Sequence, residues 1–421
     1  MTDLKKVRAA ASKHGKGKGK KNQWFGYVVG IGGVSVATAL AVLVVILNPD
    51  RKPHQIPVND EWLISRVQSD KIFEAGPVEH FEDHTLADVR RLSSNGVSPY
   101  IGGVPGCALP PAGESVPTAF DARKEWPKCL KAEPYDSKNC TSSWAIATAS
   151  SIADRFCISD PETHAGLELA PQTILSCDSK QRGCQGGDTD AAFRFAVTDG
   201  LVSEECFPFE PEGKDVTCSQ KCSNEKPLKL SSFCVVSGAE PMMRDILTNG
   251  PAVAMLVVYD DFLVYKGGVY TPGKTSHRIV DPVRRNYALQ AVKVIGWGVD
   301  IEKGRKTQPY WLIENSWGAD WGQNGIGKIA RGDSDQEKKL FLNLFTVAGV
   351  VPPVAGKMQD QGGDGSSPSP SGDDDGQQVN LQGGGWKASD LDDAEVDALL
   401  KEAAANSPGF EHLADDEEEV E

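Results

Sequence analysis

The sequence predicts an α+β fold, in which a helical first half precedes a strand-rich second half. The best helix candidate is the segment 143–157, where apolar residues recur at near-helical spacing. Three apolar runs at 252–258, 291–296 and 310–314 have the composition of buried strands. A helical region followed by a group of strands indicates separate helical and sheet layers, which is the α+β class.

The charge of the chain lies mainly at its two ends. Residues 1–25 carry eight Lys or Arg against one Asp, a net charge of +7, and residues 357–421 carry a net charge of −15. The total of −15 therefore describes an acidic tail and leaves an ordinary central region. This distribution argues against a nucleic acid as partner of the central region.

Residues 24–47 form an uncharged apolar run that predicts a transmembrane helix. As a helix, 24 residues span roughly 36 Å, enough for the hydrocarbon core of a bilayer. Lysines cluster before the run, so we expect a cytosolic N-terminus and a lumenal or extracellular main domain in the secretory or endolysosomal pathway. The alternative is a cleaved signal peptide, which is less favoured because the run is long and no small-x-small cleavage site follows it.

The region 49–115 is polar and rich in proline, with two short helical patterns at 60–67 and 86–92. In the first pattern we expect Trp62, Leu63 and Val67 to share one face. Far beyond the central region, residues 389–405 predict another short helix in the acidic tail.

All ten cysteines lie between Cys107 and Cys234. An even, clustered set indicates disulfides formed in an oxidising compartment. The alternative, a zinc site, is less favoured because paired Cys-x-x-Cys spacing is absent and histidines are few. We therefore expect no metal and no cofactor.

Several ordered motifs then carry a family resemblance. The run 116–123 reads Val-Pro-Thr-Ala-Phe-Asp-Ala-Arg, and the run 139–145 reads Asn-Cys-Thr-Ser-Ser-Trp-Ala. Further along, 183–187 reads Gly-Cys-Gln-Gly-Gly and 314–318 reads Glu-Asn-Ser-Trp-Gly. Together they resemble the papain family of cysteine peptidases, in its cathepsin B branch.

The resemblance implies a papain-like fold of two subdomains, one helical and one barrel-like, with a groove between them. It places Gly186, Gly187 and Trp317 along that groove. It also implies four disulfides: Cys129–Cys157, Cys140–Cys184, Cys177–Cys218 and Cys206–Cys222. Cys107 and Cys234 are left over, and their pairing stays open.

With this resemblance we expect six segments: 1–23, a basic cytosolic segment; 24–48, a transmembrane signal-anchor; 49–115, a pro-segment-like region; 116–352, the cathepsin B-like domain; 353–385, a flexible Gly/Ser/Asp linker; and 386–421, an acidic tail with a short helix. Because a chain that cannot cleave cannot remove its own pro-segment, that region is a candidate occupant of the groove.

The catalytic positions of the family are degenerate here. By resemblance, Ser143 occupies the position of the nucleophilic cysteine, Gln290 that of the histidine and Ser137 that of the oxyanion-binding glutamine. Only the asparagine remains, as Asn315. A hydroxyl needs a base to become a nucleophile, and an amide such as Gln290 cannot accept the proton. Loss of the oxyanion donor removes a further ~3 kcal/mol of transition-state stabilisation.

The sequence therefore predicts a membrane-anchored, catalytically inactive papain-like protein that binds a protein or peptide partner. It is similar to the tubulointerstitial nephritis antigen group, which carries serine at the cysteine position. One alternative is an active hydrolase that uses Ser143 with an unorthodox base such as His277. Another is a structural subunit of a membrane complex.

Overall fold

The computed structural model of this 421-residue chain describes residues 56–70, 72–92, 104–108, 115–131, 133–210, 217–218, 224–280, 288–301, 307–331 and 346–354. The predicted anchor at 24–47 and the acidic tail at 386–421, with its short helix, lie outside these residues. Within the described ranges, no helix combines the length and the apolar character needed to cross a bilayer.

The helices of the described residues fall mainly before the strands, as the α+β prediction requires. The α-helices are α2 Glu61–Asp70, α3 Leu86–Leu92, α4 Ala122–Glu125, α5 Ser143–Ser159, α6 Pro161–His164, α7 Pro171–Cys177, α8 Thr189–Thr198 and α9 Ala239–Asn249. The short 3-10 turns are η2 Glu79–Phe81, η3 Gly183–Gln185 and η4 Phe262–Val264.

The strands form one large sheet and one small two-stranded sheet. They are β1 Glu74–Ala75, β2 Phe120–Asp121, β3 Ser232–Val236, β4 Ala252–Val257, β5 Tyr265–Gly267, β6 Val269–Tyr270, β7 Leu289–Asp300, β8 Gln308–Glu314, β9 Ile326–Ala330 and β10 Thr346–Val350. The large sheet runs in the order β3-β10-β4-β7-β8-β9-β6, with β2 also paired to β7. Its pairs are antiparallel except β6 with β9.

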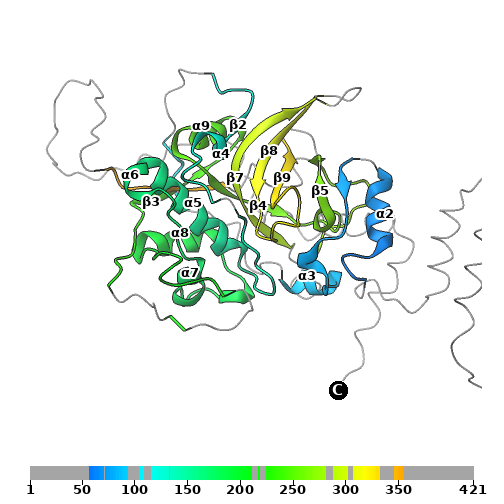
Figure 1. The fold of residues 1–421 in the computed structure, drawn as a ribbon, viewed down its shortest axis with the longest axis horizontal. Helices are drawn as coiled ribbons and strands as arrows, with labels where there is room; N and C mark the ends of the chain where they lie inside the picture. Colours follow the sequence, from blue (N-terminus) through cyan, green and yellow to red (C-terminus); the bar gives the residue numbers. More distant parts are fainter. Residues whose placement is uncertain are drawn as a thin grey trace, which may run out of the picture. The chain divides into compact units, whose positions relative to one another are not determined.

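Helix α5 is the centre of the fold, because every residue from Ser143 to Cys157 is buried. Its apolar side chains share a core with α7 and α8 and with strands β4, β7 and β10. Figure 1 shows α5, α7 and α8 gathered on one side of strands β7, β8 and β9. A helix buried all round has mostly apolar or small residues, and this one is rich in alanine and serine. Its buried charged residues, Asp154 and Arg155, are held in ion pairs.

Residues 56–70 and 72–92, together called the groove segment below, pack onto the strand-rich side of the molecule. Their buried apolar side chains belong to the same core cluster as β4, η4, β7 and β8; they are Val58, Leu63, Val67, Phe73, Val78, Phe81 and Val89. Strand β1 pairs antiparallel with β5, next to α2 (Figure 1). The groove segment therefore shares the hydrophobic core of the strand-rich part of the fold.

The elements that periodicity predicts within the described residues are present, and most are longer than expected. The predicted helix 143–157 is α5, which ends at Ser159, and the strand expected at 291–296 extends over Leu289–Asp300. One detail of the predicted 60–67 helix was wrong. Leu63 and Val67 are buried, but Trp62 is 43% exposed, because it lies about 100° around the helix from Leu63. The Arg66 guanidinium lies over the Trp62 ring, 5.2 Å from its centroid.

Candidate active site

The site begins at the N-terminus of α5, where a disulfide and two hydrogen bonds hold the chain. Cys140 is bonded to Cys184, and the backbone N–H of Thr141 donates to the Cys184 carbonyl at 3.0 Å. Trp144 Nε1 donates to the Thr141 carbonyl at 3.0 Å. These contacts bury Ser143, whose Oγ accepts a hydrogen bond from the Ala291 backbone N–H at 3.3 Å.

Gln290, on β7, lies opposite this helix terminus and is also buried. Its Nε2 donates to Asn315 Oδ1 at 2.8 Å and to Ser316 Oγ at 3.2 Å. Asn315 Oδ1 accepts a second bond from the Ser316 backbone N–H at 2.8 Å. The amide thus supplies the N–H donor that an imidazole would supply to an asparagine, without a group that can accept a proton at neutral pH. We call Ser143, Gln290, Asn315 and Ser316 the neutral cluster.

Ser137 lies on the loop before α5 and is buried. Its backbone N–H donates to the Ser316 carbonyl at 2.9 Å, and its carbonyl accepts from the Cys140 N–H at 2.9 Å. The structure therefore brings Ser137, Ser143, Gln290 and Asn315 together, as the family resemblance requires, although they come from three separate parts of the chain.

The groove segment closes this site. His80, Phe81 and Val89 line a cavity together with Ser143 and Gln290. The cavity measures ≈ 20 Å³, which holds about one water molecule. A peptide substrate has no room there while the segment is in place.

Polar and aromatic contacts fix the segment over the site. His80 Nδ1 donates to Asp136 Oδ1 at 2.6 Å, and His84 Nε2 lies 3.1 Å from Asn139 Oδ1. Burial opposes the charge of Asp136, but the bond from His80 and that from the Lys138 backbone N–H hold the pKa of this carboxyl below its usual value. The ionised carboxylate only accepts, so the proton of this pair resides on Nδ1.

Trp317 forms the apolar side of the cavity. Phe81 meets its ring edge-on, with ring centroids 5.0 Å apart, and His80 stacks over it at 6.1 Å. Gly186 and Gly187, also expected along the groove, are buried. A Cβ at Gly187 would come within 2.6 Å of the Trp144 ring, so glycine is needed there for packing against α5.

His277, considered above as a base for Ser143, lies elsewhere. Its Nδ1 is 3.4 Å from Asp260 Oδ2, and Arg66 Nη2 reaches the same oxygen at 2.8 Å. His277 is absent from the residues that line the cavity. The imidazole that does line it is His80, which sequence reasoning missed because nothing in its neighbourhood marks it as part of a site.

Three disulfides implied by the resemblance are present: Cys129–Cys157, Cys140–Cys184 and Cys177–Cys218. Cys206 is disulfide-bonded, and its expected partner Cys222 lies outside the described residues. The question left open by the sequence is answered, because Cys107 is bonded to Cys234. Within the described part of the chain, no group of three or more His, Cys, Asp or Glu is placed to hold a metal ion.

A second buried polar group lies deeper between the same elements. Lys293 Nζ, on β7, contacts Asp154 Oδ2 at 2.9 Å, Glu314 Oε1 at 3.1 Å and Ser150 Oγ at 2.6 Å. Burial disfavours its charge, yet the two carboxylates keep the pKa of Lys293 above its ordinary value. Burial also raises the pKa of Asp154 to about 7. We call Ser150, Asp154, Lys293 and Glu314 the charged cluster.

Comparison with known proteins now decides the family. A model described as papain family cysteine protease matches residues 116–341, more than half of the chain.

The chain belongs to the papain family.

Its curated relatives in this family include both proteinases and nephritis antigens by name. The human tubulointerstitial nephritis antigen-like protein is 33% identical over 256 residues, covering 55% of this chain and 54% of its own length. Cathepsin B-like cysteine proteinase 1 of Ostertagia ostertagi is 30% identical over 302 residues, covering 64% and 84%. The chain thus spans about half the length of the first of these relatives.

Solved papain-family structures agree. The proCathepsin B S9 from Trypanosoma congolense superposes with a TM-score of 0.59 at 28% identity, covering 71% of this chain and 100% of that one. The proform of the ragweed pollen allergen Amb a 11, at 19% identity and a TM-score of 0.55, shares the fold. The first of these two is a procathepsin, which is consistent with a pro-segment lying in the groove of this papain-family chain.

Proposed function

We propose that this papain-family chain is catalytically inactive and acts by binding a protein or peptide partner as a scaffold. The observation that carries the proposal is the neutral cluster. Ser143 stands where a thiolate is needed, and Gln290 donates to Asn315 without being able to accept a proton. The thiolate–imidazolium pair that starts peptide cleavage therefore has no source in this cluster. Ser137 stands where the oxyanion-binding amide would be, so the donor that stabilises the transition state is missing as well.

The closed groove is the second support for a binding role. His80 and Phe81 lie against Trp317, and the space left beside Ser143 holds about one water molecule. A partner would therefore contact the outer surface of the domain while the groove segment is in place. The membrane anchor at 24–48 and the acidic tail at 386–421 belong to the same proposal, as the means by which the domain is held at a membrane and recruits partners.

One observation favours a second candidate, a serine hydrolase. His80 lines the same cavity as Ser143, and its Nδ1 is held by Asp136. A carboxylate bonded to one ring nitrogen leaves the other nitrogen as a base, which is the logic of serine hydrolase triads. Against it, the base then belongs to the segment that occupies the substrate groove.

Labelling with a fluorophosphonate probe separates the two candidates. We expect no labelling of the intact chain, nor of a chain cut by an engineered protease site between residues 93 and 103, after which the segment can leave. Ser143→Ala is the matched control. Labelling of the wild type that is lost in both Ser143→Ala and His80→Gln would establish the hydrolase and refute the inactive scaffold.

A further inference from the structure

The groove segment has a covalent attachment that lies outside the groove. Cys107 follows the segment in the chain and precedes the domain that begins near residue 116, and it is bonded to Cys234, 127 residues away. Of the described residues that line the cavity, none belongs to this attachment. The attachment therefore holds the segment without contributing to the site itself.

Backbone pairing holds the chain around Cys107 in register with β3. The Cys107 N–H donates to the Val235 carbonyl at 3.0 Å, and the Val235 N–H donates to the Pro105 carbonyl at 2.9 Å. Gly106 pairs with Val235 in the parallel sense, on the edge of the sheet that β3 forms. The bond thus joins two stretches of backbone that are already aligned.

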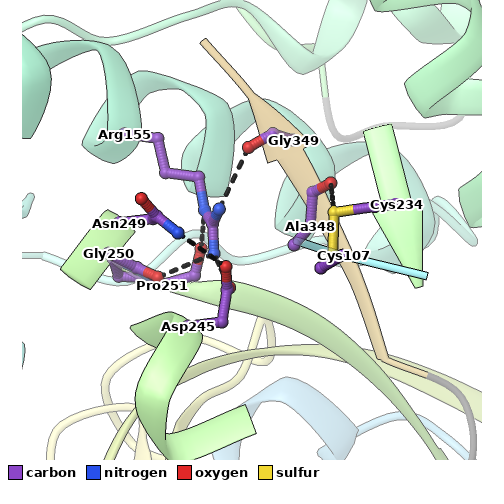
Figure 2. The surroundings of a disulfide bond; sticks show 9 residues. All are labelled: Cys107, Arg155, Cys234, Asp245, Asn249, Gly250, Pro251, Ala348 and Gly349. Atoms are coloured by element: carbon purple, nitrogen blue, oxygen red, sulfur yellow. Dashed lines mark hydrogen bonds and ion pairs between the residues drawn. A yellow bond between two sulfur atoms is a disulfide. The ribbon is translucent and has the colours of Figure 1, made fainter. Parts of the chain in front are cut away.

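Strand β3 is itself a firm support. It pairs with β10 over five residues, and Cys234 Sγ lies 3.7 Å from the Ala348 carbonyl (Figure 2). The buried Arg155 of α5 donates to the Gly349 carbonyl at 3.0 Å and forms an ion pair with Asp245 of α9. Figure 2 shows Arg155 and the disulfide on opposite sides of the strand that carries Ala348 and Gly349, so the guanidinium joins α5, α9 and β10 next to the strand that β3 pairs with.

We propose that the Cys107–Cys234 bond makes the groove segment a permanent part of the protein, so that proteolytic cleavage after Cys107 leaves the groove closed. A cut between residues 109 and 114 separates the segment from the domain in the chain, but residue 107 remains bonded to β3. The product is a two-chain protein whose groove still contains His80 and Phe81. This holds whether or not Ser143 is reactive.

The physical reason is effective concentration. A severed segment held only by its own contacts dissociates on dilution, whereas a segment joined through Cys107 rebinds intramolecularly. Linked binding of this kind exceeds unlinked binding by about 10²–10⁴ in equilibrium constant. The groove therefore opens only after a cut upstream of Cys107, between residues 93 and 103, or after a cut between residues 109 and 114 combined with reduction of the Cys107–Cys234 bond.

The test uses the full chain with an engineered protease site between residues 109 and 114, immobilised through its C-terminal end and labelled near its N-terminus. After cleavage we expect the labelled fragment to stay bound through extended washing. In Cys107→Ser combined with Cys234→Ser, which leaves no unpaired thiol from this bond, we expect the fragment to be lost about 100-fold faster. Equal retention of the fragment in both proteins would overturn the proposal.

A second cut position supplies the matched control. With the site between residues 93 and 103, the fragment no longer contains Cys107, and we expect fast loss from the disulfide-bonded protein as well. A fluorescent synthetic peptide of residues 56–92 then reports the state of the groove. It should bind the protein cut at 93–103 and not the one cut at 109–114. Binding of the peptide to both would show that the bond does not keep the groove closed, and would also overturn the proposal.

Discussion

Two buried polar clusters lie between α5, β7 and the end of β8, and they differ in charge. The neutral cluster is built from two hydroxyls and two amides, with Gln290 Nε2 donating to Asn315. The charged cluster holds Lys293 between Asp154 and Glu314, all at least nine-tenths buried. Ser143 and Ser150 are two helical turns apart on α5, so the two clusters share one helix face.

The contrast shows where ionic chemistry has been kept in this molecule. At the groove, the neutral cluster holds uncharged side chains, and Gln290 donates to both Asn315 and Ser316. In the interior, the ion pairs of Lys293 with Asp154 and Glu314 join helix α5 to strands β7 and β8. A buried charge is costly unless it is paired. Lys293 therefore requires α5, β7 and β8 to be placed so that Asp154 and Glu314 reach its ammonium group.

Removing the cation of the charged cluster should give the largest loss of stability, and it tests the difference between the two clusters most directly. Lys293→Met leaves Asp154 and Glu314 buried without their partner, and we expect the free energy of unfolding to fall by about 3–5 kcal/mol. Denaturant unfolding measures it. Arg194→Met, at the exposed pair with Asp190, is the control and should cost less than about 1 kcal/mol. Comparable losses at the two positions would contradict the role given to the charged cluster.

A substitution in the neutral cluster should lower the free energy of unfolding by less than Lys293→Met does. Gln290→Ala removes the donor to Asn315 and Ser316 and leaves two buried acceptors with one partner fewer, so we expect a loss of about 1–3 kcal/mol in unfolding free energy. Gln290→His restores an N–H donor and should recover part of that loss. Thermal or denaturant unfolding of the three proteins decides it. A Gln290→Ala variant as stable as the wild type would show that the amide contributes no stabilising contact.

The smallest expected effect concerns the contact of the groove segment with the loop before α5. The pKa of Asp136 is lowered in the folded state, so its contribution to stability is present above its unfolded pKa of about 3.9 and is lost as pH falls through the lower folded value. The backbone amides of residues 78–84 should therefore stay protected from hydrogen exchange at pH 5. Their protection, relative to an unfolded chain at the same pH, should fall only below about pH 4.

Asp136→Asn tests the same contact at constant pH. Because the Asp136 side chain is 35% exposed, we expect a loss of only about 1 kcal/mol, or roughly fivefold faster exchange of residues 78–84 at pH 5–7. Asp190→Asn, on the surface of α8, should leave these amides unchanged. Release of the segment between pH 7 and pH 5 in the wild type would mean that another group governs the contact.

Local pattern was a sound guide to the elements and to the chemistry that the site lacks. The periodicity of 143–157 predicted α5. The residue types showed that position 143 carries no thiol, position 290 no imidazole and position 137 no glutamine amide. Periodicity failed for Trp62, where a helical position 100° from the buried stripe falls at the surface. His80 escaped notice because its partner Asp136 is 56 residues away, a distance that no local pattern spans.

The sequence by itself determined which groups exist at each position, and therefore that Ser143 and Gln290 cannot form a thiolate–imidazolium pair. Only the tertiary structure decided that His80 and Phe81 cover Ser143, that Lys293 carries its charge between two carboxylates, and that Cys107 bonds Cys234. Side-chain chemistry and helical periodicity are local properties of the chain. Contacts between residues 56 to 148 apart depend on how its elements pack, and packing is settled only when the whole core forms.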